Sequence, residues 1–304
     1  MNWSSDENIQ RIYRLLRIKG FGPVQVNRLL YKYKEQIRST ADFEQCIVRA
    51  LTSKECDEYM QDLELYHSLK FYVSYRSILD TEEYPNELRL FLSQRSPSVL
   101  SYIGNIELLK KKKIAFCGSR KTSEKGIWIT RDCISQLSID KDICVVSGYA
   151  AGVDMAAHYA ALENGLSTII ILPEGISHFS IRKELQPVWD INKVLVVSEF
   201  FPYDNWLEGR AMQRNKTIIG LSSAVVVVEA GESGGSFDAG KQTLEGGKKL
   251  FVPKYAVPPI SALGNAKLLQ GGALPLAKNP ITHQTNLNEL WRTMQTPSKC
   301  LLFD

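Results

Sequence analysis

The spacing of apolar residues changes once along the chain, near residue 112. From residue 6 to about residue 78 apolar residues recur every three or four positions, which is the spacing of one buried face of a helix. Asp6 is placed to cap the first helix, and the segment 19–23 interrupts the pattern with two glycines and a proline. The spacing predicts helices from residue 6 to about residue 78. The clearest positions are Ile9, Ile12, Tyr13, Leu15, Leu16, Leu29 and Leu30.

After this change the apolar residues form short continuous runs rich in β-branched side chains, and helical stretches separate most of the runs. Such runs are typical of parallel strands that are buried on both faces by crossover helices. The pattern predicts an α/β fold, an extended Rossmann-like, doubly wound and mostly parallel sheet. The predicted strands are 113–117, 143–146, 168–172, 194–197, 224–228 and 250–253.

These two patterns divide the chain into three parts. Residues 1–78 are expected to form a small helical domain, and residues 79–280 the Rossmann-like domain. Residues 281–304 are polar with a few apolar positions, such as Leu287 and Trp291, and predict a short C-terminal helix or tail.

The turn between the first two predicted helices, Lys19-Gly20-Phe21-Gly22-Pro23, resembles a helix-hairpin-helix. In that motif the backbone N–H groups of a Gly-x-Gly turn bind a DNA phosphate. A plain helical hairpin with glycine at its turn accounts for the same residues. Both interpretations stay open at the level of sequence.

Composition narrows the class of protein only modestly. The formal net charge of +4 and the pI of about 8.6 permit nucleic-acid binding without requiring it. The six cysteines form no CxxC pair, and no histidine lies at ligand spacing from them, so we expect no metal site and a reducing compartment. We also expect a cytoplasmic protein without membrane contact, because the chain shows no signal peptide and no apolar run near ~20 residues.

Small residues and glycines follow four of the predicted strands. Ligands of open parallel sheets bind outside the carboxyl ends of the strands. Glycine lets an anion approach backbone N–H groups, and the N-terminus of the following helix favours negative charge. The loops predict a phosphate-binding surface, although the glycines also suit tight turns. These loops are 118–120, 147–154, 173–175 and 229–236.

A second basic segment, Arg210 to Thr217, precedes a predicted helix or strand at Ile218. Its arginines and lysine can bind phosphates, whereas the alternative is an ordinary solvated helix start. The first loop lacks the GxGxxG fingerprint, and Gly240-Lys241 lacks the spacing of a P-loop, so no cofactor is expected. His158 follows Asp154 at helical spacing, but no nucleophile accompanies the pair, and we expect a packed histidine rather than a catalytic one.

The order of these motifs resembles the DprA/Smf family of DNA-processing proteins over about residues 10–280. Each block alone is weak, but their joint order is specific. The matching blocks are Tyr84-Pro85, Pro97-x-Val99-Leu100, Gly118-Ser119-Arg120, Ser147-Gly148, Gly152-Val153-Asp154, Ser198-Glu199-Phe200, Arg214-Asn215-Lys216, Val227-Val228-Glu229-Ala230, Ser233-Gly234 and Gly272-Ala273.

The resemblance implies a SAM-like helical domain followed by an extended Rossmann-like domain. It implies a homodimeric protein, not an enzyme, that binds single-stranded DNA and delivers it to a RecA-type recombinase, as in natural transformation. Carried over motif by motif, the DNA-contact residues are Gly118, Ser119, Arg120, Gly148, Gly152, Arg214, Asn215, Lys216, Gly234, Gly235 and Ser236.

The chain departs from the family pattern at several positions. Ala151 stands where a basic residue is usual, Lys216 replaces an arginine, and Gly235 lengthens the last loop. We also expect no C-terminal winged-helix domain of the kind that many members carry, and this expectation leaves open another DNA transaction, on a mobile element or in defence. The alternative function is a nucleotide sensor or a nucleoside-monophosphate phosphoribohydrolase, in which Asp238 lies one position from the catalytic acid.

Overall fold

The computed structural model describes residues 2–61 and 73–295. It contains two compact units. The first comprises Met1–Ile103 with Glu174–His178 and Val197–Asn205, and the second comprises Gly104–Pro173, Phe179–Val196 and Trp206–Asp304. The domain boundaries expected after residues 78 and 280 stay a prediction.

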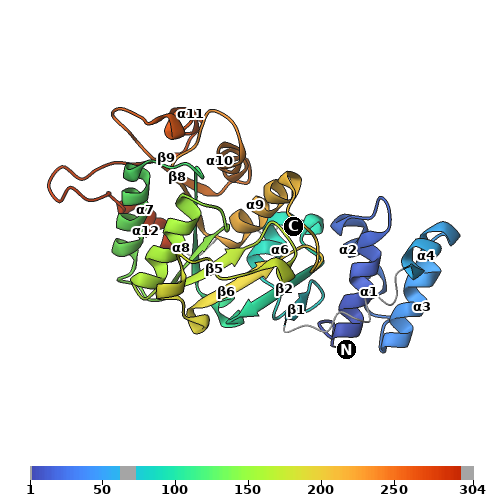
Figure 1. Ribbon diagram of the computed structural model, residues 1–304. Helices are drawn as coiled ribbons and strands as arrows, with labels where there is room; N and C mark the ends of the chain where they lie inside the picture. The colour runs from blue at the N-terminus through green and yellow to red at the C-terminus, as the bar shows by residue number, and fades with distance from the viewer. Residues whose placement is uncertain (1, 62–72, 296–304) are drawn as a thin grey trace. The chain divides into compact units, whose positions relative to one another are not determined.

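Helices open the first unit, as the apolar spacing predicts. They are α1 (Asp6–Arg17), α2 (Pro23–Tyr33), α3 (Thr40–Ala50) and α4 (Ser53–Met60) (Figure 1). The predicted apolar face of α1 is buried, with Ile9, Ile12 and Leu15 inside. Ser39 begins α3 with a capping box, in which its hydroxyl accepts the Asp42 N–H and the Asp42 carboxylate accepts the Ser39 N–H.

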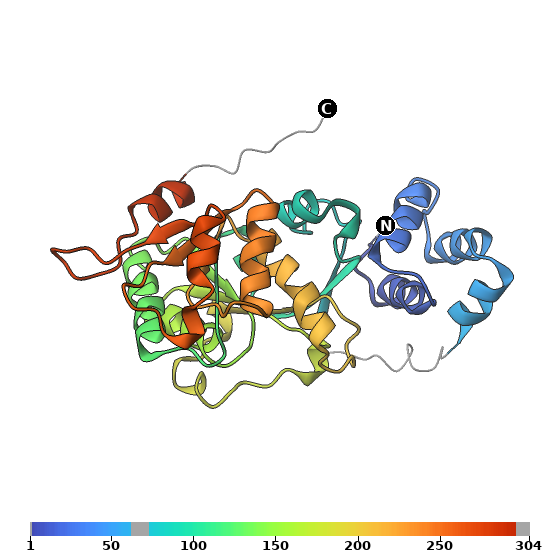
Figure 2. The same ribbon diagram turned by 90° about the horizontal axis from the view of Figure 1, so that it is seen from above.

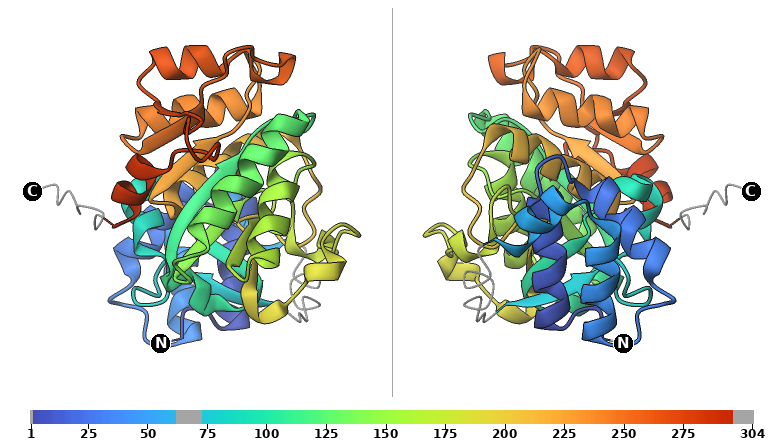
Figure 3. Two further views of the ribbon diagram at one scale, coloured as in Figure 1. Left: turned by 90° about the vertical axis from the view of Figure 1, so that its left-hand side faces the viewer. Right: turned by 90° about the vertical axis from the view of Figure 1, so that its right-hand side faces the viewer.

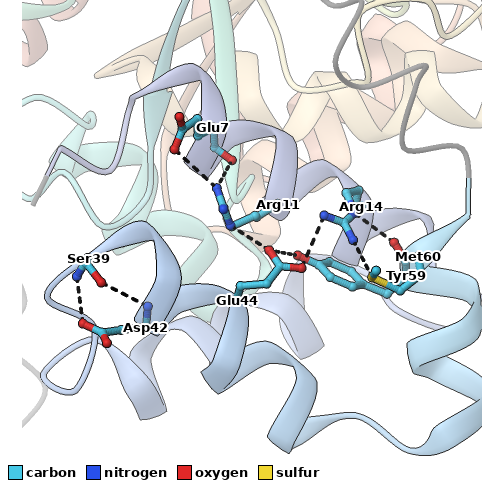
Figure 4. Close-up of polar contacts among 8 residues, drawn as sticks. All are labelled: Glu7, Arg11, Arg14, Ser39, Asp42, Glu44, Tyr59 and Met60. Atoms are coloured by element: carbon cyan, nitrogen blue, oxygen red, sulfur yellow. Dashed lines mark hydrogen bonds and ion pairs between the residues drawn. The ribbon is translucent and has the colours of Figure 1, made fainter.

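Two arginines of α1 join three of these helices (Figure 4). The Nε of Arg11 donates to the Glu44 carboxylate of α3 at 2.8 Å, and Nη1 of Arg14 lies 3.5 Å from the same carboxylate. The Arg14 guanidinium also lies 3.7 Å from the centroid of the Tyr59 ring, and its Nε donates to the Tyr59 carbonyl at 2.9 Å. Burial of Arg14 is therefore compensated by a charge, a ring and a carbonyl.

The prediction of helix up to about residue 78 is wrong at Ser74–Ser77, which form the strand β1. This strand pairs antiparallel with β2 (Val99–Gly104). Its four residues are too few to carry a recognisable period, so pairing with β2 decides their conformation. Residues 62–72 of the predicted helical stretch lie outside the described residues. The helix α6 (Asn86–Leu92) connects the two strands.

Buried Asn27 of α2 fixes the segment that leads into β2. Its side-chain amide donates to the carbonyls of Gln94 and Ser96 at 3.0 and 2.8 Å. Its side-chain oxygen accepts the hydroxyl of Ser98 at 2.6 Å. Since every polar atom of this amide has a partner, its burial costs little.

In residues 2–61 and 73–295, nine strands form one sheet in the order β1-β2-β6-β5-β4-β3-β7-β8-β9. All six strands predicted from the sequence are present, and the mostly parallel α/β fold is confirmed. The strands β1, β2 and β9 were not part of that prediction. The remaining strands are β3 (Lys112–Cys117), β4 (Ile143–Ser147), β5 (Ser167–Ile171), β6 (Val194–Ser198), β7 (Ala224–Val227), β8 (Lys249–Pro253) and β9 (Leu274–Leu276).

Helices cover both faces of the parallel strands in the second unit (Figures 1, 2 and 3). One core contains Ile114 and Phe116 of β3 with Cys133 of α7 and Ala157 of α8, and it also takes in Leu290 of α12. On the other face α9 packs beside α10. Their bounds are α7 (Glu124–Leu137), α8 (Val153–Glu163), α9 (Glu208–Leu221), α10 (Gly235–Glu245), α11 (Asn265–Gln270) and α12 (Asn288–Gln295).

Candidate nucleic-acid interface

The strand order creates a topological switch point between β3 and β7. Both neighbours of β3, β4 and β7, run parallel to it, and the helices that follow β3 and β7 cover opposite faces. The loops after these two strands therefore run in opposite directions, one over each face of the sheet. Doubly wound sheets bind their ligands in the crevice between such loops. The loops 118–123 and 228–234 lie at this point, and the loop 148–152 follows the neighbouring strand β4. We call this edge the carboxyl rim.

Glycines at the rim allow two loops to touch. Gly152 has a φ of +78°, and a Cβ atom there would lie 2.2 Å from the carbonyl oxygen of Ser119. A Cβ at Gly118 would lie 2.6 Å from Cγ2 of Val153. The structure thus brings Gly118, Ser119, Arg120 and Gly152 together, as the sequence predicts. The two glycines have a packing role here whatever ligand the rim accepts.

Arg214 lies inside α9, so the expectation that the segment 210–217 precedes a new element is wrong. Its side chain is only 6% exposed, and Nη1 donates to the Ile171 carbonyl at 2.8 Å. A Cβ atom at Gly148 would lie 1.9 Å from this Nη1 and 2.4 Å from Oδ2 of Asp154. The guanidinium and the carboxylate therefore lie together beneath the glycine of the second loop.

Asp154 is also only 6% exposed. Burial raises the pKa of Asp154, while the Arg214 charge and hydrogen bonds act in the opposite direction. One of these bonds comes from the Ala150 N–H at 3.3 Å. We call Gly148, Asp154 and Arg214 the buried charge cluster. It holds the second loop in place.

His158 supports the same loop from below. It is fully buried, with Nε2 against the Gly148 carbonyl and Nδ1 2.7 Å from Oγ1 of Thr168. Burial lowers the pKa of His158 to about 4, so the ring is neutral near pH 7. Since Gly148 offers only an acceptor, Nε2 carries the ring proton. This setting is that of a packed histidine.

The exposed charges of the rim lie elsewhere. Arg120 is exposed, and its guanidinium lies 5.7 Å from the centroid of the Trp206 ring, which is itself 45% exposed. Lys216 is exposed on α9, whereas the amide of the adjacent Asn215 donates to the Gly235 carbonyl at 3.4 Å. Sequence reasoning missed Trp206, because an isolated tryptophan carries no motif.

The loop after β7 ends at the start of α10. Gly234 has a φ of +95°, and a Cβ atom there would meet nothing within 4 Å. Gly235 and Ser236 begin α10, and Gly234 and Gly235 are exposed. Gly234 is required by its backbone conformation alone, whereas Gly118 is required by a close neighbour and Gly152 by both. It leaves an open helix N-terminus, which favours an anion.

The turn between α1 and α2 offers fewer donors than the helix-hairpin-helix interpretation needs. The Lys19 N–H donates to the Glu58 carboxylate at 2.8 Å. The N–H groups of Phe21 and Gly22 donate to the Ile18 carbonyl and to Oε1 of Gln25. These contacts favour the plain helical hairpin.

Comparison with known proteins decides the family. A model of the family described as DNA recombination-mediator protein A matches residues 76–286. The chain belongs to this family. The predicted DprA/Smf membership is confirmed, as is the predicted place among proteins of DNA processing and recombination.

Two curated relatives carry the name DNA processing protein DprA. The protein of Streptococcus pneumoniae is 36% identical over 199 residues, which are 65% of this chain and 68% of the relative. The protein of Bacillus subtilis is 32% identical over 203 residues, which are 64% of this chain and 65% of the relative. The chain thus spans about two thirds of the length of these family members.

Solved structures of DprA share the fold. The S. pneumoniae protein superposes with a TM-score of 0.73 at 28% identity, over 90% of this chain and 94% of that one. The Helicobacter pylori protein, described for its single-stranded DNA binding mode, gives a TM-score of 0.58 at 24% identity, over 68% and 91%. Both superpositions agree with the extended Rossmann-like architecture of the family.

The buried histidine predicts a pH dependence of stability. His158 binds a proton in the unfolded chain below about pH 6.5 but in the folded chain only near pH 4. The free energy of unfolding should therefore fall as the pH drops through this range, by up to about 3 kcal/mol. Urea titrations between pH 7 and pH 4 test this.

The variant His158→Gln isolates the effect, because its stability should depend less on pH over the same range. Asp154 acts with the opposite sign, since a raised carboxyl pKa favours the folded state at low pH. A His158→Gln profile that parallels the wild type would contradict the assignment.

The buried charge cluster predicts a large effect of Arg214 on stability. In Arg214→Ala the Asp154 carboxylate loses its neighbouring cation, and the free energy of unfolding should fall by about 3–5 kcal/mol. The double variant Arg214→Ala/Asp154→Asn should lose less than the sum of the single variants. Urea unfolding measures both. Arg214→Ala with wild-type stability would instead favour the predicted direct DNA contact of Arg214.

Proposed function

We propose that the carboxyl rim binds the phosphate backbone of single-stranded DNA during DNA processing for recombination. The observation that carries the proposal is the pairing of exposed cations with open glycine loops on one edge of the sheet. Arg120 and Lys216 supply the charge, and Gly234 leaves the N-terminus of α10 accessible. The described binding of single-stranded DNA by the H. pylori structural neighbour supports the same ligand class.

In this proposal the exposed groups of the rim contact the DNA, and the buried groups hold the loops in position. Arg120 is suited to bidentate phosphate binding and Lys216 to a point-charge contact. Trp206 adds an exposed ring beside Arg120, on which a base can stack. Arg214 positions the second loop from inside, because only 6% of the residue is exposed to solvent. Ser119, Gly235 and Ser236 remain predicted backbone and hydroxyl contacts.

A single strand suits this rim better than a duplex. Loops lined by Gly118, Gly152 and Gly234 require a backbone that bends from one phosphate to the next. A duplex is stiff over about 150 bp, whereas a single strand follows the loops without that cost. The proposal is therefore a single-strand binder rather than a duplex reader.

The proposal includes no chemical step and no cofactor. The ionisable groups beneath the rim, Asp154, His158 and Glu229, all take part in internal contacts. A binding role fits these contacts. We place this role in the cytoplasm, with a second copy of the chain and a RecA-type recombinase as the partners that the family resemblance suggests. Asp238 lies in the first turn of α10. In the alternative hydrolase function, it is the residue that would act as the catalytic acid.

Reversing the two exposed charges tests the proposed site. In Arg120→Glu/Lys216→Glu, two phosphate contacts become two repulsive charges, and the affinity for a single-stranded oligonucleotide should fall by more than about 100-fold. Fluorescence anisotropy at constant salt measures the affinity. The thermal midpoint should change little, because both side chains are exposed.

Lys249→Glu is the matched control. Lys249 is exposed at the amino end of β8, on the opposite edge of the sheet. This variant should keep oligonucleotide binding. A folded Arg120→Glu/Lys216→Glu protein that binds as well as the wild type would place the DNA elsewhere.

Salt dependence and strand preference provide a second test. Two cations that neutralise about two phosphates give a slope of about −1.4 for log K against log salt on single strands. A duplex of the same length should bind more weakly at every salt concentration. Titrations of both DNA forms decide this, and equal affinity for the two forms would exclude the single-strand model.

A further inference from the structure

Glu229 lies two residues after the end of β7, at the topological switch point, and is fully buried. Its carboxylate accepts five hydrogen bonds from other parts of the chain. Oε2 accepts from the hydroxyls of Thr122 and Ser261 at 2.8 and 2.7 Å and from the Ser123 N–H at 2.8 Å. Oε1 accepts from the hydroxyls of Tyr255, at 2.9 Å, and Ser123.

This carboxylate lies at the N-terminus of α7. Ser123 caps that helix, so its N–H belongs to the positive end of a 14-residue helix dipole. Gly126 in the first turn allows the approach, since a Cβ atom there would lie 2.7 Å from the Glu229 carboxyl group. In doubly wound folds the phosphate of a bound nucleotide lies at this same place, the N-terminus of the helix after the first strand.

The surrounding donors keep Glu229 charged. Burial raises the pKa of a carboxyl group, but the hydrogen bonds from Ser123, Ser261 and Thr122 outweigh this effect and lower the pKa of Glu229. Near pH 7 the side chain is therefore an anion. Its negative charge compensates the positive end of the α7 dipole, and its oxygens accept the hydrogen bonds of the surrounding hydroxyls.

We propose that Glu229 is the specificity determinant that excludes nucleotides and free phosphate from the switch point. The place that a nucleotide phosphate would take is filled by a carboxylate of the chain itself. A second anion at this point would meet both repulsion and an occupied set of donors. Anions are then left with the carboxyl rim outside the switch point, and only this last step rests on the proposed DNA binding.

A merely structural role for Glu229 makes a different prediction. If the carboxylate only satisfies nearby donors, its removal weakens the protein and added anions do not matter. If it occupies a place suited to phosphate, its removal leaves donors that a small anion can satisfy. Anion-dependent stability after removal therefore separates the two roles.

The experiment uses the full chain with Glu229→Ala and follows thermal unfolding with sodium pyrophosphate and with sodium formate. The wild type should show no saturable shift with formate. Arg120→Glu/Lys216→Glu, which lacks the exposed cations of the rim and keeps Glu229, should show none with pyrophosphate. Glu229→Ala should melt below the wild type, and its midpoint should rise saturably, on the order of 5 °C at a hundredfold excess over Kd. Glu232→Ala, which removes an exposed acid of the same loop, should behave as the wild type does.

Refolding keeps the test decisive if Glu229→Ala does not fold alone. Formate or pyrophosphate in the refolding buffer should then increase the recovered folded fraction, and sodium chloride at equal ionic strength should not. A saturable pyrophosphate shift in Arg120→Glu/Lys216→Glu, in which Glu229 is intact and the rim cations are gone, would overturn the proposal. So would a Glu229→Ala protein that neither anion stabilises or refolds. Oligonucleotide binding by the wild type is measured separately, so its failure would concern the proposed function alone.

Discussion

The carboxyl rim depends on a buried cation placed directly under a glycine. The Arg214 guanidinium occupies the space that a side chain at Gly148 would need, next to the Asp154 carboxylate. A buried charge is costly unless partners surround it, so these residues and the Ile171 carbonyl constrain one another. The loop after β4, its glycine and the position of α9 follow from this arrangement. Arg120 on the first loop and Lys216 on α9 are the exposed cations beside this arrangement.

Buried and exposed charges therefore have separate tasks at one edge of the sheet. The buried groups hold backbone: Arg214 binds a carbonyl of β5, and His158 contacts the carbonyl of Gly148. The exposed groups, Arg120 and Lys216, remain available to a ligand. Glu229 adds a third element, because it neutralises a helix end that would otherwise attract phosphate. In other doubly wound proteins the switch point binds a nucleotide. Here we propose that the switch point is closed to nucleotides and that the exposed rim binds single-stranded DNA.

How far the sequence predicts this molecule depends on the range of each interaction. The six parallel strands are predictable, because burial on both faces leaves continuous apolar runs. β1 is not, since Ser74–Ser77 become a strand only by pairing with β2. The rim glycines are predictable from strand ends, but the burial of Arg214 is not. In the segment Arg214-Asn215-Lys216 all three residues look solvent-facing, and only the turn of α9 directs the first inward.

Glu229 marks the limit of such reasoning most clearly. Its position after a strand is visible in the sequence, yet its partners Thr122, Ser123, Tyr255 and Ser261 come from three separate segments. A glutamate just after the end of a strand is compatible with a catalytic role, with metal binding or with internal hydrogen bonds that hold neighbouring loops together. Only the convergence of five donors on one buried group distinguishes these cases. The function of a site in this fold thus depends on which polar residues are left to bind a ligand after the others have formed hydrogen bonds within the chain.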